Sequence, residues 1–76
     1  MPRGYFNWTF HDVVKVLHAR GFVQVGVEGS HYSFERTVEG KRYITGVAFH
    51  GNKTLKPRTI KSIIAQSGMP KKEWFR

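Results

Sequence analysis

Histidine is the residue type of this chain best suited to proton transfer near neutral pH, and the sequence holds four copies. The ordinary pKa of an imidazole is about 6.5, so the ring can take up and release a proton under physiological conditions. His31 follows the pair Gly29-Ser30 at the start of an expected strand, and His50 stands in an expected loop. Both are candidate acid–base groups. The alternatives are a local turn hydrogen bond for His31 and plain solvation for His50.

Positive charge is concentrated in the second half of the chain. Residues 1–40 carry four basic and four acidic side chains, so the formal charge of +8 lies entirely in residues 41–76. A polarised basic surface is typical of nucleic-acid binding, although acidic proteins and anionic membranes also attract such surfaces. Four bases flank the start of the expected last helix, where a helix N-terminus favours phosphate; ordinary solvated lysines are the alternative. These candidate RNA-binding residues are Lys53, Lys56, Arg58 and Lys61.

Length and composition exclude several classes of protein. A chain of 76 residues has room for one domain. The absence of cysteine excludes a disulfide framework, a cysteine-based zinc site and a thiol nucleophile. No acidic cluster predicts a Mg²⁺ site, so we expect no metal and no cofactor. No apolar run approaches the ~18 residues of a membrane span, and no signal-peptide core follows the first residues. We therefore expect a cytoplasmic protein that does not enter membranes.

The hydrophobic pattern predicts an α+β fold with the order α-β-β-β-α. Apolar residues at helical spacing predict helices over 9–20 and 57–66, and an alternating pattern predicts strands over 22–27, 31–37 and 41–49. Short connections favour a three-stranded antiparallel sheet with both helices on one face, which leaves the other face open. Val23, Val25 and Val27 should lie together on one half-buried face of the first strand, whereas the third strand indicates no clear buried face.

Residues 1–76 are expected to form a single domain with a core over about 9–69. An aromatic segment, 1–8, precedes this core, and a basic-aromatic tail, 70–76, follows it. Trp74 and Phe75 either dock onto the domain or contact a partner.

Four segments of the chain resemble the HicA-type toxins of bacterial and archaeal toxin–antitoxin pairs. They are Gly21-Phe22, Gly29-Ser30-His31-Tyr32-Ser33-Phe34, Phe49-His50-Gly51-Asn52 and the stretch from Leu55 to Gly68. The resemblance covers roughly residues 11–69. It implies a fold like a double-stranded-RNA-binding domain, mRNA cleavage with His31 as the essential residue, and neutralisation by a cognate HicB-type antitoxin. Many members carry a proline two residues before the second histidine, where this chain has Ala48.

RNA supplies its own nucleophile, the 2′-hydroxyl, so a ribonuclease needs only a base, an acid and cations. We therefore expect a metal-independent endoribonuclease that leaves a 2′,3′-cyclic phosphate, with His31 as base and Gly29, Ser30 and His50 as supporting residues. Two other functions stay open: an RNA-binding module of the same fold without catalysis, and an interaction domain that docks an acidic protein. The antitoxin should be acidic where it covers His31 and residues 53–61. The sequence indicates no oligomeric state.

Overall fold

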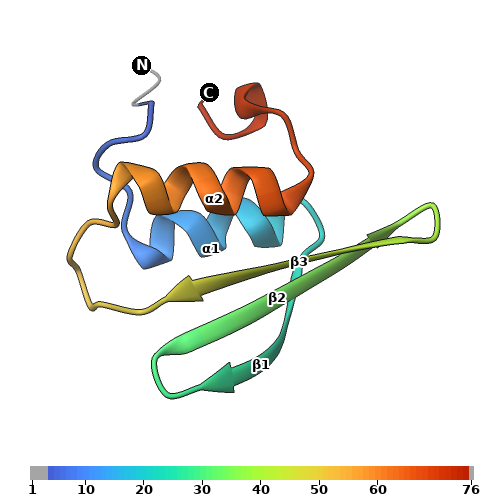
Figure 1. The fold of residues 1–76 in the computed structure, drawn as a ribbon, viewed down its shortest axis with the longest axis horizontal. Coiled ribbons are helices and arrows are strands. Elements are labelled where there is room, and N and C mark those ends of the chain that lie inside the picture. Colours follow the sequence, from blue (N-terminus) through green and yellow to red (C-terminus); the bar gives the residue numbers. More distant parts are fainter. Residues whose placement is uncertain (1–3, 76) are drawn as a thin grey trace.

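The chain forms a helix, three strands and a second helix in the predicted order (Figure 1). The computed structural model describes residues 4–75. The strands pair antiparallel in the order β1-β2-β3, and both helices lie on one face of this sheet. The predicted α+β fold is therefore confirmed. The elements are α1 (Phe10–Ala19), β1 (Val23–Glu28), β2 (His31–Val38), β3 (Lys41–Ala48), α2 (Pro57–Ser67) and a short 3-10 helix, η1 (Lys71–Glu73).

Both ends of α1 carry residues that favour a helix boundary. The Thr9 hydroxyl accepts a hydrogen bond from the Asp12 N–H at 3.3 Å, and the Asp12 carboxylate accepts one from the Thr9 N–H at 3.0 Å. This reciprocal capping box satisfies two N–H groups that have no partner inside the helix. Gly21, with φ of 90°, follows the helix in the left-handed conformation that favours glycine.

Two tight turns fix the register of the sheet. Glu39 and Gly40 both have positive φ, 50° and 82°, which is the pattern of a type I′ hairpin turn between β2 and β3. Gly29, with φ of 61°, begins the two-residue turn between β1 and β2. As a result His31 is the first residue of β2 and pairs with Ala48 at the end of β3.

The expectation for the valines of β1 is wrong. Val23, Val25 and Val27 are 58%, 50% and 55% exposed. The pairing register shifts between Gln24 and Gly26, so Val23 and Val27 do not lie on the same face of the sheet. In addition, β1 is the edge strand farthest from the helices, which pack on β3 (Figure 1). The alternating apolar pattern therefore predicted the strand correctly, but it did not predict how exposed the side chains of the strand are.

The core lies between the helices and the inner face of β2 and β3. Thr45 and Val47 of β3 are buried and Ile44 is exposed, which settles the face of the third strand. Ile60, Ile63 and Ile64 form a buried stripe on α2.

The segments that flank the expected core are part of it. Trp74 is 4% exposed and packs against Trp8, with ring centroids 5.8 Å apart, while Phe75 meets Tyr5 at 4.9 Å. Of the two alternatives for the tail, docking onto the domain is confirmed. The buried core therefore extends beyond residues 9–69 on both sides, and residues 1–3 and 76 of the flanks lie outside the described residues.

Candidate functional site

A groove of about 490 Å³ lies beside the end of β3, between the sheet and the start of α2. It brings His31 together with His50, Lys53 and Lys56, residues that the sequence separates by up to 25 positions. His31 and His50 are both exposed, so a ligand can reach them. The remaining lining residues are Gly46, Ala48, Thr54, Leu55 and Thr59.

The sheet brings the two histidines to the same groove. His31 pairs with Ala48, and the Phe49 N–H donates to the Ser30 carbonyl at 2.7 Å, which extends the pairing one step beyond β3. His50 follows immediately and faces the same groove. Ser30 and Gly29 do not line the groove: Ser30 contributes its carbonyl to the pairing, and Gly29 contributes the turn.

The opposite wall of the groove is held by the segment before α1. The Leu55 N–H donates to the Trp8 carbonyl at 2.6 Å, and Thr54 forms an isolated antiparallel bridge with Thr9. Leu55 is 6% exposed and belongs to the core. The loop between β3 and α2 is therefore tied down just before Lys56, so its lysines have a defined position relative to the histidines.

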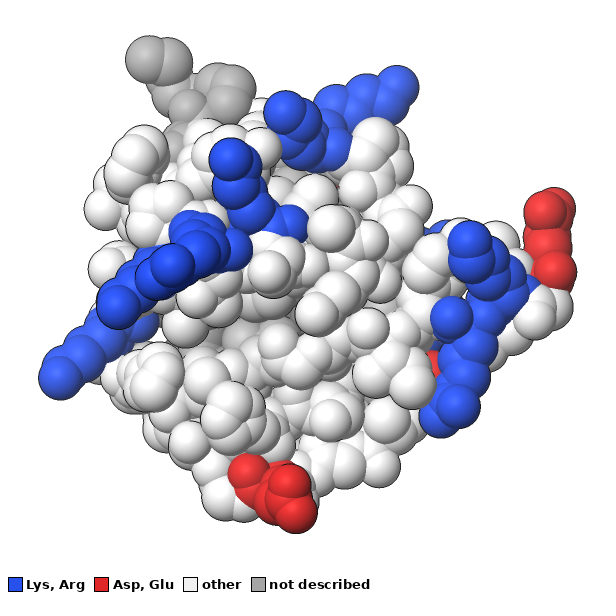
Figure 2. Space-filling view, viewed as in Figure 1, with Lys and Arg blue, Asp and Glu red and all other residues white. Residues whose placement is uncertain are grey.

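The groove is positively charged. No acidic side chain lines it, and two lysines do. Lys56 is the N-cap of α2, but no side chain caps that helix, and its first turn holds no acidic residue. The positive end of the helix dipole is thus uncompensated by a side chain beside the groove. Figure 2 shows blue side chains over the loop and the start of α2, on the left of the view.

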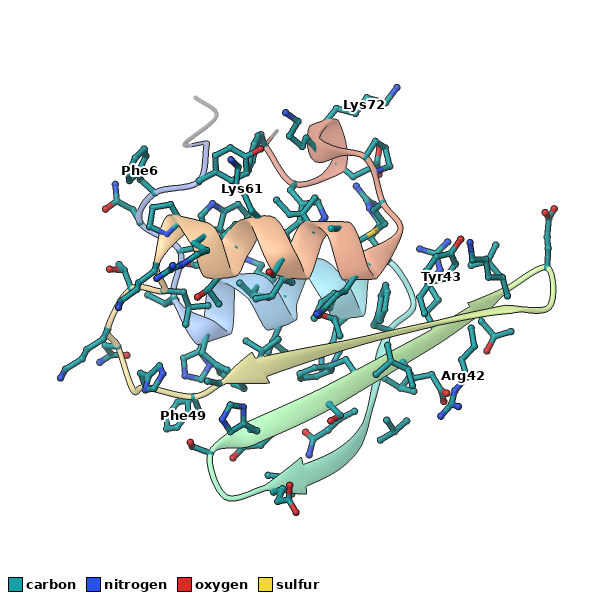
Figure 3. The ribbon with its side chains drawn as sticks, in the orientation of Figure 1. Phe6, Arg42, Tyr43, Phe49, Lys61 and Lys72 are labelled. Atoms are coloured by element: carbon teal, nitrogen blue, oxygen red, sulfur yellow. The ribbon has the colours of Figure 1, made fainter. Side chains whose placement is uncertain are left out.

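Two of the four predicted RNA-binding residues do not line this groove. Arg58 is exposed on α2 outside it, and the Lys61 ammonium lies 5.5 Å from the centre of the Tyr5 ring, on the upper side of α2 (Figure 3). The predicted basic cluster is therefore divided, and Lys53 and Lys56 are its groove members.

Three other titratable side chains near this sheet do not line the groove. Glu35 forms an ion pair with Arg42 across β2 and β3. His11 and His18 are exposed on α1, with rings 5.9 Å from those of Phe49 and Phe34 respectively. Neither helical histidine lines the groove, so each is a suitable control for His31.

Sequence reasoning missed the small residues that leave room for a ligand. Gly46 and Ala48 line the groove from β3, and a Cβ built on Gly46 would have only the Tyr32 carbonyl oxygen within 4 Å, at 3.9 Å. The signal was present: the Glu39-Gly40 turn fixes a register that sets Ala48 opposite His31. Within residues 4–75, no three His, Asp or Glu side chains are gathered as metal ligands would be. None of the helices in that span is long and apolar enough to cross a membrane.

Comparison with known protein families finds a match over most of the chain. The family model described as the HicA toxin of bacterial toxin–antitoxin systems matches residues 10–69. The chain belongs to the HicA toxin family. As a family of toxin–antitoxin toxins, HicA implies a cognate antitoxin as partner. Neither the curated proteins nor the solved structures that were searched gave a match. The HicA match includes every residue that lines the groove and excludes Trp8 and Trp74.

Proposed function

We propose that this HicA toxin is a metal-independent endoribonuclease that cleaves mRNA, with His31 as the catalytic residue. One observation carries the proposal: an exposed imidazole shares a groove with a second imidazole and two lysines, and no carboxylate lines that groove. This set supplies the base, the acid and the cations that transfer of an RNA phosphate requires.

The reaction needs no nucleophile from the protein. The His31 imidazole removes the proton from a ribose 2′-hydroxyl, and the resulting oxygen attacks the adjacent phosphorus. The bond from phosphorus to the 5′-oxygen breaks, and His50 donates a proton to that leaving oxygen. Lys53 and Lys56 stabilise the negative charge that builds up on the phosphate oxygens. The products are a 2′,3′-cyclic phosphate and a free 5′-hydroxyl, so the atoms and protons balance.

The antitoxin proposal follows from the same charges. A partner that silences cleavage by covering His31 would meet Lys53 and Lys56, so an acidic surface fits best. The exposed Arg58 at the start of α2 adds a further cation at that contact.

The test is cleavage of mRNA by the wild type, His31→Ala and His18→Ala, each in EDTA. We expect the wild type and the His18 variant to cut in EDTA and to leave cyclic phosphate ends. His31→Ala should lose at least ~100-fold in rate, since general acid–base catalysis contributes about 10²–10⁴-fold. Adding the cognate antitoxin should stop the cleavage. Activity that disappears in EDTA and returns with Mg²⁺ would contradict the mechanism.

A non-catalytic RNA-binding module is the second candidate, because the same cationic groove also suits simple binding. It would be favoured if both the wild type and His31→Ala shift RNA on a gel and leave it intact. If neither binds RNA, docking of an acidic protein onto the basic half becomes the better explanation.

A further inference from the structure

A second cavity lies at the opposite end of α2 from the groove. Its volume is about 320 Å³, and it is formed where the β2–β3 hairpin extends beyond the helices. Figure 3 shows Tyr43 in this corner, between the end of α2 and the hairpin. The lining residues are Arg20, Arg36, Val38, Tyr43, Gly68, Met69, Pro70 and Glu73. None of them lines the groove that contains His31.

The charges of this cavity do not balance. Arg20 forms an ion pair with Glu73, with its Nη2 at 2.8 Å from the carboxylate, but its buried Nε has no acceptor among the described residues. Arg36 pairs with no carboxylate of residues 4–75; its guanidinium lies 6.0 Å from the centre of the Phe22 ring. Two half-buried guanidinium groups therefore face a single carboxylate. The surplus positive charge favours an anionic ligand, above all a phosphate.

The rest of the cavity is apolar and closely packed. The Tyr43 ring packs so closely on Gly68 that a Cβ there would lie 2.3 Å from a ring carbon. Val38 and Met69 add aliphatic surface. The volume is at the lower end of the ~300–1,000 Å³ range of ligand sites, which suits one nucleotide.

Between the cavity and the groove, β3 and α2 contribute no acidic residue, and the Glu35 carboxylate of β2 is paired with Arg42. No Asp or Glu occurs from Lys41 to Lys72, the stretch that contains β3 and α2. Figure 2 shows blue side chains at both sides of this face with white between them; red appears at the lower rim and beside the hairpin. His31 and Arg36 are five residues apart on β2, ~17 Å along the strand, and this odd spacing places their side chains on opposite faces of the sheet. A stacked nucleic-acid strand advances ~3.4 Å per nucleotide, so an RNA that reaches both sites by passing over the edge strand β3 needs more than about five nucleotides.

We propose that this cavity is a second RNA subsite, in which Arg36, with Arg20 beside it, binds a phosphate of the strand whose scissile phosphate lies at His31. The inference rests on the proposed function, because it requires RNA in the groove. It adds a binding site remote from the chemistry, which makes affinity depend on the length of the RNA. The apolar surface around Tyr43 receives the sugar or base attached to that phosphate.

The experiment uses the full chain in a His31→Ala background and measures RNA binding as a function of salt. Arg36→Gln keeps part of the aliphatic stem and removes the charge. Arg42→Gln is the matched control, since Arg42 is exposed on the same hairpin, pairs with Glu35 and does not line the cavity. Thermal unfolding of each variant shows whether the fold is retained. The probes are single-stranded RNAs of two and of eight nucleotides.

We expect Arg36→Gln to weaken binding of the eight-nucleotide RNA about tenfold more than Arg42→Gln does, and to lower the slope of log affinity against log salt by about one. Binding of the two-nucleotide RNA should not respond to Arg36. Equal effects of the two substitutions on the longer RNA, or loss of dinucleotide binding with Arg36→Gln, would overturn the second subsite and leave the ribonuclease proposal intact. No binding of either RNA to the His31→Ala protein would overturn both.

Discussion

At the scale of single residues, the groove is open because two residues of β3 that line it have a very small side chain or none. Gly46 and Ala48 stand where β3 passes His31, and only a backbone oxygen lies near the position of a Cβ on Gly46. The φ of Gly46 is not positive, so other residues can adopt its backbone conformation without strain. This position therefore allows the groove to be filled without disturbing the fold.

Gly46→Val should abolish or strongly reduce RNA cleavage while the protein stays folded. The valine methyl groups would occupy the groove next to His31, and valine has a higher strand propensity than glycine. We expect a loss of at least about tenfold in cleavage rate, with a melting temperature equal to or above that of the wild type. RNA cleavage and thermal unfolding measured on the same sample separate the two effects.

The control for this substitution is Gly26→Val on β1. Gly26 and Gly46 pair with Ser33 from opposite sides, and a Cβ on Gly26 would meet nothing within 4 Å. The control variant should cut RNA like the wild type. If Gly46→Val cut RNA equally well, the groove would not be the place where the scissile phosphate binds.

At the scale of elements, the ends of helices were predictable and the burial of the edge strand was not. The signals for α1 act within a few residues of the sequence: Thr9 and Asp12 cap one end and Gly21 follows the other. Burial of β1 depends instead on which strands the helices cover, a long-range property that alternation does not contain. The valines of β1 are exposed because the helices do not cover this strand and because its register shifts between Gln24 and Gly26.

Loss of the α1 capping box should lower stability without changing the groove chemistry. Thr9→Ala removes the hydroxyl that accepts the Asp12 N–H, at a cost of about 1 kcal/mol in the free energy of unfolding. For a domain of this size that corresponds to a fall of ~4–8 °C in melting temperature. Thr9→Ser keeps the hydroxyl and serves as control. Calorimetry that shows the same melting temperature for Thr9→Ala and the wild type would contradict the capping argument.

The candidate site was predictable only in part, because its assembly also depends on contacts between residues that are distant in sequence. His31 and His50 could be selected from residue type, turn chemistry and the family resemblance. Their meeting in one groove depends on the loop between β3 and α2, which is tied to the segment before α1 by the Leu55–Trp8 hydrogen bond. A contact across 47 residues of sequence leaves no local pattern, so the division of Lys53 and Lys56 from Lys61 could not be anticipated.

At the scale of the whole molecule, the two flanking segments close the core that supports the groove. Trp8 supplies the carbonyl that holds Leu55, and its ring packs against Trp74 from the tail. Arg20 at the end of α1 pairs with Glu73, which joins the tail to the helix layer a second time. The tail is therefore a structural part of the domain, even though the HicA match ends at residue 69.

Trp74→Ala should destabilise the protein severely. Replacing a buried tryptophan by alanine costs ~3–5 kcal/mol, whereas a domain of this length has a total stability of roughly 4–11 kcal/mol. We expect the midpoint of urea unfolding to fall steeply, and RNA cleavage to decline in parallel as the folded fraction declines. Phe6→Ala is the control, because Phe6 belongs to the same aromatic region but is 63% exposed, and it should change stability little. If both substitutions shifted the midpoint equally, the tail would not be packed into the core as the Trp8–Trp74 contact requires.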